Sequence, residues 1–365
     1  MYARGVSDNK GQILAAIDAA AAVLAEAKAR GERPPINFKV LVEGCEEYGS
    51  AGIPEWVAAN RALLKADAAL STDGMQPVEG GALMLGLRGL AMCQIDAHSA
   101  SIDLHSGVYG GVVANPLHAV AAALAALRDP QSNRITVPGF YDGVADPTAE
   151  ELADWAASAP DEATLLAAVG LPPGHYGGEE GRSWAERNWA RPTLEVVGMH
   201  GGFQGDGMKT VLPREAHAKI ACRLVPGQDP DKVHAGIKSA ILGMGSNFAG
   251  VQFNVSCPEG AAAYIMPKDL PLNRAAATVL EGVYGSKPGY VRWGATVPIV
   301  PLLHKELGLY TTTVGFGLED DKWHSPDEVL DLERFSMAAD AYVELYHRYA
   351  QEGRAASAQT DRSEL

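Results

Sequence analysis

The sequence predicts an α/β protein into which a second, α+β module is inserted. Helix and strand signals alternate through the first hundred residues, as they do in βαβ units. The alternation stops near Arg88 and returns after about Pro258, and the segment between them indicates two helices on an antiparallel sheet. We therefore expect one discontinuous domain (1–87 and 259–352), an inserted module (88–258) and a disordered polar tail (353–365).

The expected elements of the discontinuous domain follow from hydrophobic periodicity and from Gly and Pro stops. Gly31 and the Pro34-Pro35 pair end the first predicted helix. The predicted helices are Gly11 to Arg30, Ile53 to Lys65, Leu272 to Tyr284 and Leu330 to Ala350. The predicted strands are Phe38 to Val42, Ala68 to Ser71 and Leu309 to Val314.

The inserted module has clear helix-start signals. Asn115 is placed to cap a helix that begins at Pro116, and Thr148 and Glu151 form a capping-box pattern. The predicted order is a strand or hairpin (Leu90 to Leu104), a helix (Pro116 to Arg128), an irregular insert with two short helices (Asp129 to Pro192), strands near Thr210 to Leu212 and Lys219 to Val225, and a helix (Pro230 to Met244).

Composition excludes several classes of function. The net charge of −15 disfavours nucleic-acid and membrane-surface binding, because phosphate backbones and anionic lipids repel an acidic protein. The longest apolar stretch, Ala82 to Met92, is interrupted by Arg88 and is too short to span a bilayer. No secretory signal is visible, and the four cysteines lie far apart without a CxxC pair. We expect reduced, buried thiols and a cytoplasmic protein.

Acidic residues and one histidine follow the ends of predicted strands or open a helix. They are Asp8, Glu46, Glu47, Asp73 and His324. Each alone is most often a helix cap or a solvated loop residue. Together they should meet at the edge of an open sheet where ligands collect, and a cation would offset their charge. The mixed oxygen and nitrogen donors suit Zn²⁺, with Mn²⁺ as the second choice.

Three segments resemble the signatures of the co-catalytic zinc peptidases. They are Gly5 to Gly11, Glu43 to Ser50 and the loop around His324. That family includes carnosine dipeptidase, carboxypeptidase G, acetylornithine deacetylase and succinyl-diaminopimelate desuccinylase, and the dipeptidase branch is the most similar. The resemblance implies a mostly parallel catalytic sheet with helices on both faces and a ferredoxin-like lid that makes a homodimer.

The resemblance also implies a role for each acidic residue. Asp8 would bridge two metal ions, Glu47 and His324 would complete one site, and Asp73 would belong to the other. Glu46 would be the general base that activates water and then protonates the leaving amine.

The lid matches further segments of the dipeptidase branch. His105, in Asp103 to Gly111, resembles the histidine that stabilises the oxyanion in the partner subunit's site. Thr210 and Arg223 lie in segments that resemble those that grip the substrate carboxylate, for which a guanidinium is suited. Thr296 resembles a loop residue whose hydroxyl contacts substrate, although from the residue alone we favour a turn-shaping role.

The sequence differs from the family pattern in two places. The family places a His-x-Asp motif and the first strands upstream of the bridging aspartate, whereas this sequence begins seven residues before Asp8. We therefore expect a fragment or a misplaced gene start, with one complete metal site of the family's two. The stretch Ala261 to Leu272 also lacks the histidine that the dipeptidase branch carries there.

The expected function is metal-dependent hydrolysis of dipeptides or similar small substrates with a free carboxylate. Two alternatives remain open, an N-acyl amino acid deacylase of the same fold and a non-catalytic homologue that only dimerises. Serine or cysteine hydrolysis is disfavoured, because no G-x-S-x-G elbow occurs and Cys45 has no identifiable base partner.

Overall fold

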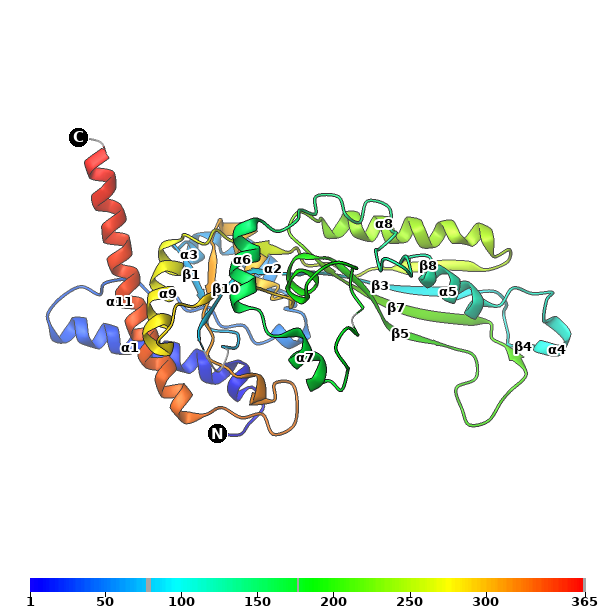
Figure 1. The fold of residues 1–365 in the computed structure, drawn as a ribbon, viewed down its shortest axis with the longest axis horizontal. Coiled ribbons are helices and arrows are strands. Elements are labelled where there is room, and N and C mark those ends of the chain that lie inside the picture. Colours follow the sequence, from blue (N-terminus) through cyan, green and yellow to red (C-terminus); the bar gives the residue numbers. More distant parts are fainter. Residues whose placement is uncertain (77–79, 176, 364–365) are drawn as a thin grey trace.

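The computed structural model describes residues 1–76, 80–175 and 177–363. The chain forms an elongated molecule with two parts (Figure 1). One part holds both termini, and the other extends away from it as a long sheet covered by helices (Figure 1). The division confirms the predicted architecture of an α/β part with an inserted α+β module.

The sheet of the part with the termini has the strand order β1-β11-β2-β10, and β9 pairs with β2. The strands are β1 (Ala69–Ser71), β2 (Ala82–Leu87), β9 (Tyr264–Ile265), β10 (Gly289–Trp293) and β11 (Thr311–Thr313). The pairs β1/β11 and β2/β10 are parallel, while β11 and β9 run antiparallel to β2. Because β1 and β11 are parallel, the loops that follow them leave the sheet at the same edge.

Three long helices share a hydrophobic core with this sheet: α1 (Gly11–Ala29), α9 (Pro271–Tyr284) and α11 (Leu332–Ser363). Buried alanines of α1, among them Ala15 and Ala19, face the core and allow α11 to approach closely. The shorter helices α2 (Ile53–Ala59), α3 (Arg61–Leu64) and α10 (Ile299–Leu307) contact one another, and α10 also contacts β11.

The inserted module is a four-stranded antiparallel sheet with the order β5-β7-β3-β8. Along the chain it runs β3 (Gly89–His98), α5 (Pro116–Ala125), β5 (Thr193–Gly201), β7 (Glu215–Leu224), α8 (Pro230–Gly243) and β8 (Gln252–Ser256). This βαββαβ connectivity is the ferredoxin-like lid that the sequence predicted. Side chains of β3 alternate between buried and accessible, and α5 and α8 pack on β3.

The insert between α5 and β5 reaches back to the first sheet. It contains α6 (Ala149–Ser158), α7 (Glu162–Ala168) and a short helical turn, η3 (Glu186–Ala190). The capping box of Thr148 and Glu151 is present at the start of α6. α6 packs on β10, and Glu151 forms an ion pair with Arg292 of that strand.

Four expectations were wrong or incomplete. Residues 38–42 pair with no strand among those described, and Val40 and Val42 are exposed. The predicted helix at 53–65 is broken at Asn60 into α2 and α3. Helix α11 continues to Ser363 instead of ending at Ala350, so it takes in most of the predicted tail; residues 364 and 365 lie outside the described ranges.

The expectation of four reduced, buried cysteines was also wrong. Cys93 and Cys257 form a disulfide, and Cys45 is exposed, whereas Cys222 is a buried free thiol. The pairing brings together residues 164 positions apart, which spacing along the chain does not reveal. No helix in the described ranges is long and apolar enough to cross a membrane.

Candidate metal centre

Asp8, Glu47 and His324 meet beyond the edge of the sheet where β1 and β11 end. Nε2 of His324 lies 2.8 Å from Oδ2 of Asp8 and 3.3 Å from Oε2 of Glu47. One donor atom from each residue lies within 4.8 Å of the others. Two carboxylates and an imidazole at this spacing form a three-donor set of the kind that holds a divalent metal.

Short local elements position these three side chains. Asp8 lies in a helical turn, η1 (Val6–Lys10), and Glu47 lies in a 3₁₀ turn, η2 (Glu46–Tyr48). His324 follows the 3₁₀ turn η5 (Glu319–Asp321) and has a left-handed φ of 56°. Such a backbone is uncommon for a residue other than glycine and persists where the surroundings impose it.

Glu328 holds the segment that carries Asp8. This buried carboxylate accepts hydrogen bonds from the backbone N–H groups of Gly5 (2.7 Å), Ser7 (3.0 Å) and Asp8 (2.9 Å). Burial pushes the pKa of Glu328 up, but these hydrogen bonds and that from Arg4 together lower it. A charged Glu328 therefore fixes the position of Asp8.

Arg4 joins the same network from the N-terminal segment. Its guanidinium donates to Oε2 of Glu328 at 3.0 Å and also pairs with Glu47. Sequence patterns missed both Arg4 and Glu328, because their partners lie far away along the chain.

Asp73 comes two residues after β1 and faces the same group. One of its carboxylate oxygens, Oδ1, is buried and has no hydrogen-bond partner within the described residues. Burial, followed by the charge of Asp8, raises the pKa of Asp73 to about 6. A bound cation would satisfy this oxygen and lower the cost of its charge, so the residue fits a metal site.

Glu46 lies at the solvent-exposed rim of the group and makes no hydrogen bond described for its side chain. Partial desolvation, followed by repulsion from Glu47 and Asp8, raises its pKa. The pKa of Asp8 is raised for the same reasons, and the hydrogen bond from His324 opposes that shift. Asp8, Glu47 and His324 thus converge, and Glu46 and Asp73 lie close enough for their charges to interact with the other acids of this cluster.

A second group lies where the two parts of the chain join, at Arg88 between β2 and β3. Nη1 of Arg223 donates to Oγ1 of Thr296 at 2.8 Å, and that hydroxyl donates to the carbonyl oxygen of Arg88 at 2.7 Å. Burial lowers the pKa of Arg223, and burial with the nearby charge of Arg223 lowers that of Arg88 to about 10. Nη1 of Arg88 is buried without a partner in the described structure, so two cations here lack full compensation.

A third group lies at the far tip of the lid. Strand β4 (Leu104–His105) pairs with β6 (Val211–Leu212), and the short helix α4 (Ser106–Tyr109) follows β4. Nδ1 of His105 accepts a hydrogen bond from the N–H of Gly107 at 3.0 Å, and Thr210 lies directly before β6. In Figure 1 this tip lies at the opposite end of the molecule from the N-terminus, so His105 does not reach Asp8 of its own chain.

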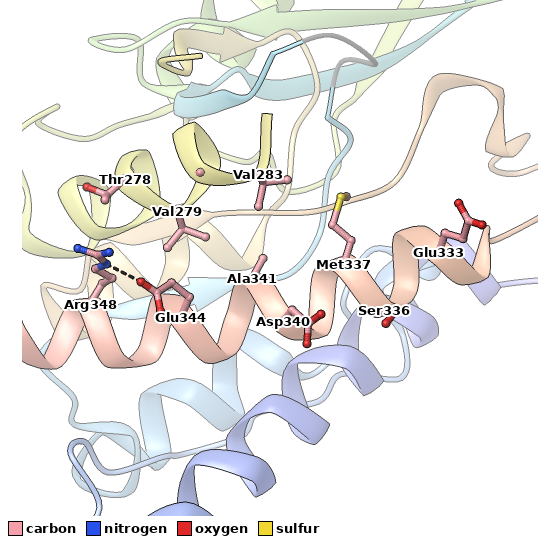
Figure 2. Close-up of a pocket in the computed structure, with 11 residues that line it drawn as sticks. Thr278, Val279, Val283, Glu333, Ser336, Met337, Asp340, Ala341, Glu344 and Arg348 are labelled. Atoms are coloured by element: carbon pink, nitrogen blue, oxygen red, sulfur yellow. Dashed lines mark hydrogen bonds and ion pairs between the residues drawn. The ribbon is translucent and has the colours of Figure 1, made fainter. Parts of the chain in front are cut away.

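Two surface grooves lie apart from the acidic cluster. Figure 2 shows the first, of about 620 Å³, between α9 and α11, where Glu344 and Arg348 pair beside Thr278 and Val279. The second, of about 550 Å³, lies at the lid tip and includes His200, Lys209 and Val211. Neither groove is lined by Asp8, Glu46, Glu47, Asp73 or His324. The candidate site is therefore identified by its clustered ionisable side chains and not by a groove.

Comparison with known proteins agrees with this arrangement. Residues 85–243 match the peptidase dimerisation domain of the M20 family. The Cys-Gly metallodipeptidase dug1 of Schizosaccharomyces pombe is 30% identical over 362 residues, which cover 96% of this chain and 73% of that protein. The chain belongs to the M20 metallopeptidase family, in its dipeptidase branch.

Solved structures of similar proteins superpose on 96% of the chain. An M20 family metallo-carboxypeptidase from Sulfolobus solfataricus matches with a TM-score of 0.84 and 29% identity, covering 96% of this chain and 77% of that one. Human carnosine dipeptidase 1 matches with a TM-score of 0.78 and 26% identity, covering 96% and 73%. The M20 fold therefore accounts for both the sheet that carries the acidic cluster and the lid.

Proposed function

We propose that this M20 chain hydrolyses the amide bond of dipeptides, or of similar small substrates with a free carboxylate, at a metal ion held by Asp8, Glu47 and His324. The observation that carries the proposal is the convergence of these three donors within 4.8 Å of one another. The relative from S. pombe is a Cys-Gly metallodipeptidase, and the similar human protein is a Beta-Ala-His dipeptidase. Both names favour dipeptides as the substrate class.

Zinc is the proposed metal, with manganese as the second choice. Catalytic zinc sites in proteins use three nitrogen or oxygen ligands and leave one position open, and the set here has that composition. When bound, the ion would act as a Lewis acid that polarises the scissile carbonyl and makes water more acidic. Asp73 would help to hold a second ion that shares Asp8.

Glu46 is the proposed general base. It lies at the exposed rim beside Glu47 and Asp8, and no hydrogen bond described for it occupies its carboxylate. Its raised pKa brings the group closer to the pH at which a carboxylate both accepts and returns a proton. Glu46 would take the proton from the attacking water and deliver it to the leaving amine.

Arg223 is the proposed partner of the substrate's carboxylate. Its Nη1 donates a hydrogen bond to Oγ1 of Thr296 at 2.8 Å, which helps to orient the guanidinium. A fixed guanidinium fork can pair with a carboxylate through two hydrogen bonds. Thr296 would position Arg223, and its own hydroxyl would lie next to the bound substrate.

The lid supplies the proposed dimer contact and two more residues. His105 and Thr210 lie at the tip, far from the acidic cluster of the same chain (Figure 1). They can act on substrate only if the tip reaches the site of a second copy. We therefore include a homodimer through the lid, with His105 stabilising the oxyanion and Thr210 contacting substrate.

A substrate panel tests the proposal. The purified full chain with added Zn²⁺ would be assayed with Cys-Gly, β-Ala-His, the C-terminal amides of both, and N-acetyl amino acids. We expect hydrolysis of the free dipeptides, at least about tenfold less of the amides, and little of the N-acetyl compounds, because the amides lack the charge that Arg223 binds. Faster hydrolysis of N-acetyl amino acids would favour a deacylase, and no hydrolysis of any compound would favour a non-catalytic homologue.

A further inference from the structure

Cys93, Cys257 and His234 form a second cluster of metal-binding side chains, inside the lid. One donor atom from each lies within 4.8 Å of the others. Cys93 belongs to β3, Cys257 follows β8 directly, and His234 lies on α8. Cys93 and His234 are buried, and Cys257 packs against the lid core. The cluster has sulfur donors and belongs to the lid, so it is separate from the acidic site on the other sheet.

The backbone around Cys257 departs from regular pairing. The ladder between β3 and β8 ends at Gln94 and Ser256, and the Cα atoms of Cys93 and Cys257 are 4.2 Å apart. Pairing resumes at Leu90 and Ala261, through backbone hydrogen bonds of 2.9 and 2.8 Å. Four residues (257–260) therefore lie opposite three residues (91–93). The segment after β8 thus has one extra residue, as in a β-bulge. Bulges of this kind redirect side chains and are common beside functional sites.

His234 offers an unused nitrogen to this position. The residue is 7% exposed, and its Nε2 is buried without a hydrogen-bond partner among the described residues. Burial lowers the pKa of its imidazole, which favours the neutral ring with a free lone pair. A buried polar atom without a partner is unfavourable unless something binds it.

We propose that reduction of the Cys93–Cys257 disulfide creates a binding site for a thiophilic divalent metal such as Zn²⁺, with two thiolates and the His234 imidazole as ligands. Reduction by two equivalents of a small thiol breaks the sulfur–sulfur bond, gives two cysteine thiols and oxidises the small thiol to its own disulfide. Metal binding then releases the two thiol protons to solvent. Two thiolates cancel the charge of the divalent ion, so the neutral complex suits a buried position.

Such a metal would take over the structural role of the disulfide. In either state, a covalent or coordinate link joins the central strand β3 to the segment after β8. The metal would also tie α8 to that link through His234. The lid would therefore stay cross-linked under both oxidising and reducing conditions.

Cobalt is a suitable probe, because thiolate-to-cobalt charge transfer gives strong near-ultraviolet absorption that nitrogen and oxygen ligands do not. The full chain would carry Cys45→Ser, since Cys45 is exposed beside Glu46. The remaining free thiol, Cys222, is buried, and its pKa is raised to about 12, so it stays protonated. After reduction and anaerobic removal of the thiol, we expect Co²⁺ to produce the absorption up to about one thiolate-bound ion per chain, beyond any Co²⁺ held by the acidic site, and Zn²⁺ to abolish it.

Matched variants make the test specific. The reduced parent and reduced Cys257→Ser both lack the disulfide, so their comparison isolates the metal ligand. We expect Cys257→Ser to lose the charge-transfer absorption and His234→Ala to lower cobalt affinity by about tenfold or more. The disulfide-bonded parent should show no absorption. Absence of the absorption in the reduced parent, or its persistence in Cys257→Ser, would overturn the proposal.

Discussion

Nε2 of His324 lies 2.8 Å from Oδ2 of Asp8, although 316 residues separate them along the chain. The contact exists because the loop after β11 and the segment before α1 meet at one edge of the sheet. Glu328 holds the two segments together, because it accepts three backbone hydrogen bonds from the segment that contains Asp8. The metal site therefore depends on contacts between segments that lie far apart in the sequence.

Replacing the proposed base should stop hydrolysis without removing metal. We predict that Glu46→Gln lowers kcat by about 10²–10⁴-fold, the usual contribution of a general base. Zinc content measured on the same sample should equal that of the parent. Glu55→Gln, an exposed carboxylate on α2, is the matched control and should leave kcat unchanged. Near-normal turnover by Glu46→Gln would remove Glu46 from the mechanism.

Glu328 should act as a positioning residue for Asp8. We predict that Glu328→Gln weakens zinc binding by about 10–100-fold, as loss of a group that holds a metal ligand in place typically does. It should also lower the free energy of unfolding by about 1–3 kcal/mol, because an amide NH₂ would face buried N–H donors. Zinc affinity would be measured by competition with a chromogenic chelator, well below the unfolding temperature. The adjacent, exposed Asp327→Asn should bind zinc as the parent does.

The stability of the metal-free chain should fall as pH rises through the range in which Asp73 ionises. The pKa of Asp73 is about 6 in the folded chain against 3.8 for an ordinary aspartate, so the folded state binds the proton more tightly. Its contribution to stability is present below about pH 4 and is lost as pH rises through about 6, about 3 kcal/mol in all. Asp73→Asn removes the ionisable group, so that variant should be more stable than the parent at pH 7.

Denaturant unfolding of the metal-free proteins between pH 4 and pH 7 would measure this difference. Asp67→Asn, an exposed residue just before β1, should behave like the parent at every pH. A parallel pH dependence for the parent and Asp73→Asn would show that Asp73 is not the group responsible. Added zinc should reverse the effect, because a cation favours the ionised carboxylate.

Arg223 should recognise the free carboxylate of the substrate. We predict that Arg223→Ala and amidation of the dipeptide each lower kcat/KM by about 10–100-fold, the value of a hydrogen bond to a charged group. Together they should cost little more than either alone, because both remove the same contact. Lys219→Ala, an exposed residue of the same strand, is the control. Multiplicative losses in the combination would place Arg223 away from that carboxylate.

Local signals predicted much of the fold. The Asn115 cap before α5 and the capping box before α6 agree with the structure, and the limits of α1 and α8 agree to within one residue, because each depends on nearby residues. The predicted helix at 272–284 begins one residue earlier, as α9.

The sequence-based predictions failed where contacts between residues far apart in the sequence determine the structure. Strand β2 and strand β3 form one apolar run in the sequence, but the chain leaves one sheet for another at Arg88. Residues 38–42 have the composition of a strand, yet they pair with no strand in the described ranges. Hydrophobicity cannot distinguish these cases, because strand pairing is not local.

The acidic cluster could be predicted because its members follow strand ends or open a helix. Arg4, Glu328 and Arg88 could not, since each acts through contacts across hundreds of residues, such as the 324 between Arg4 and Glu328. The only sequence signal for Arg88 was its position as a lone charge inside an apolar run.

Hydrolysis by this chain should require a bound metal ion, which metal analysis combined with an activity assay can establish. The disulfide-bonded chain would be stripped with a chelator, assayed with Cys-Gly, and then titrated with Zn²⁺ while bound zinc is counted. We predict no turnover without metal, and recovery in step with about one tightly bound zinc per chain, because Asp8, Glu47 and His324 form the one three-donor acidic group among the described residues. Asp8→Asn should neither retain zinc nor recover. Turnover by the metal-free chain would show that hydrolysis needs no metal, and zinc binding that survives Asp8→Asn unchanged would show that Asp8 is not a ligand.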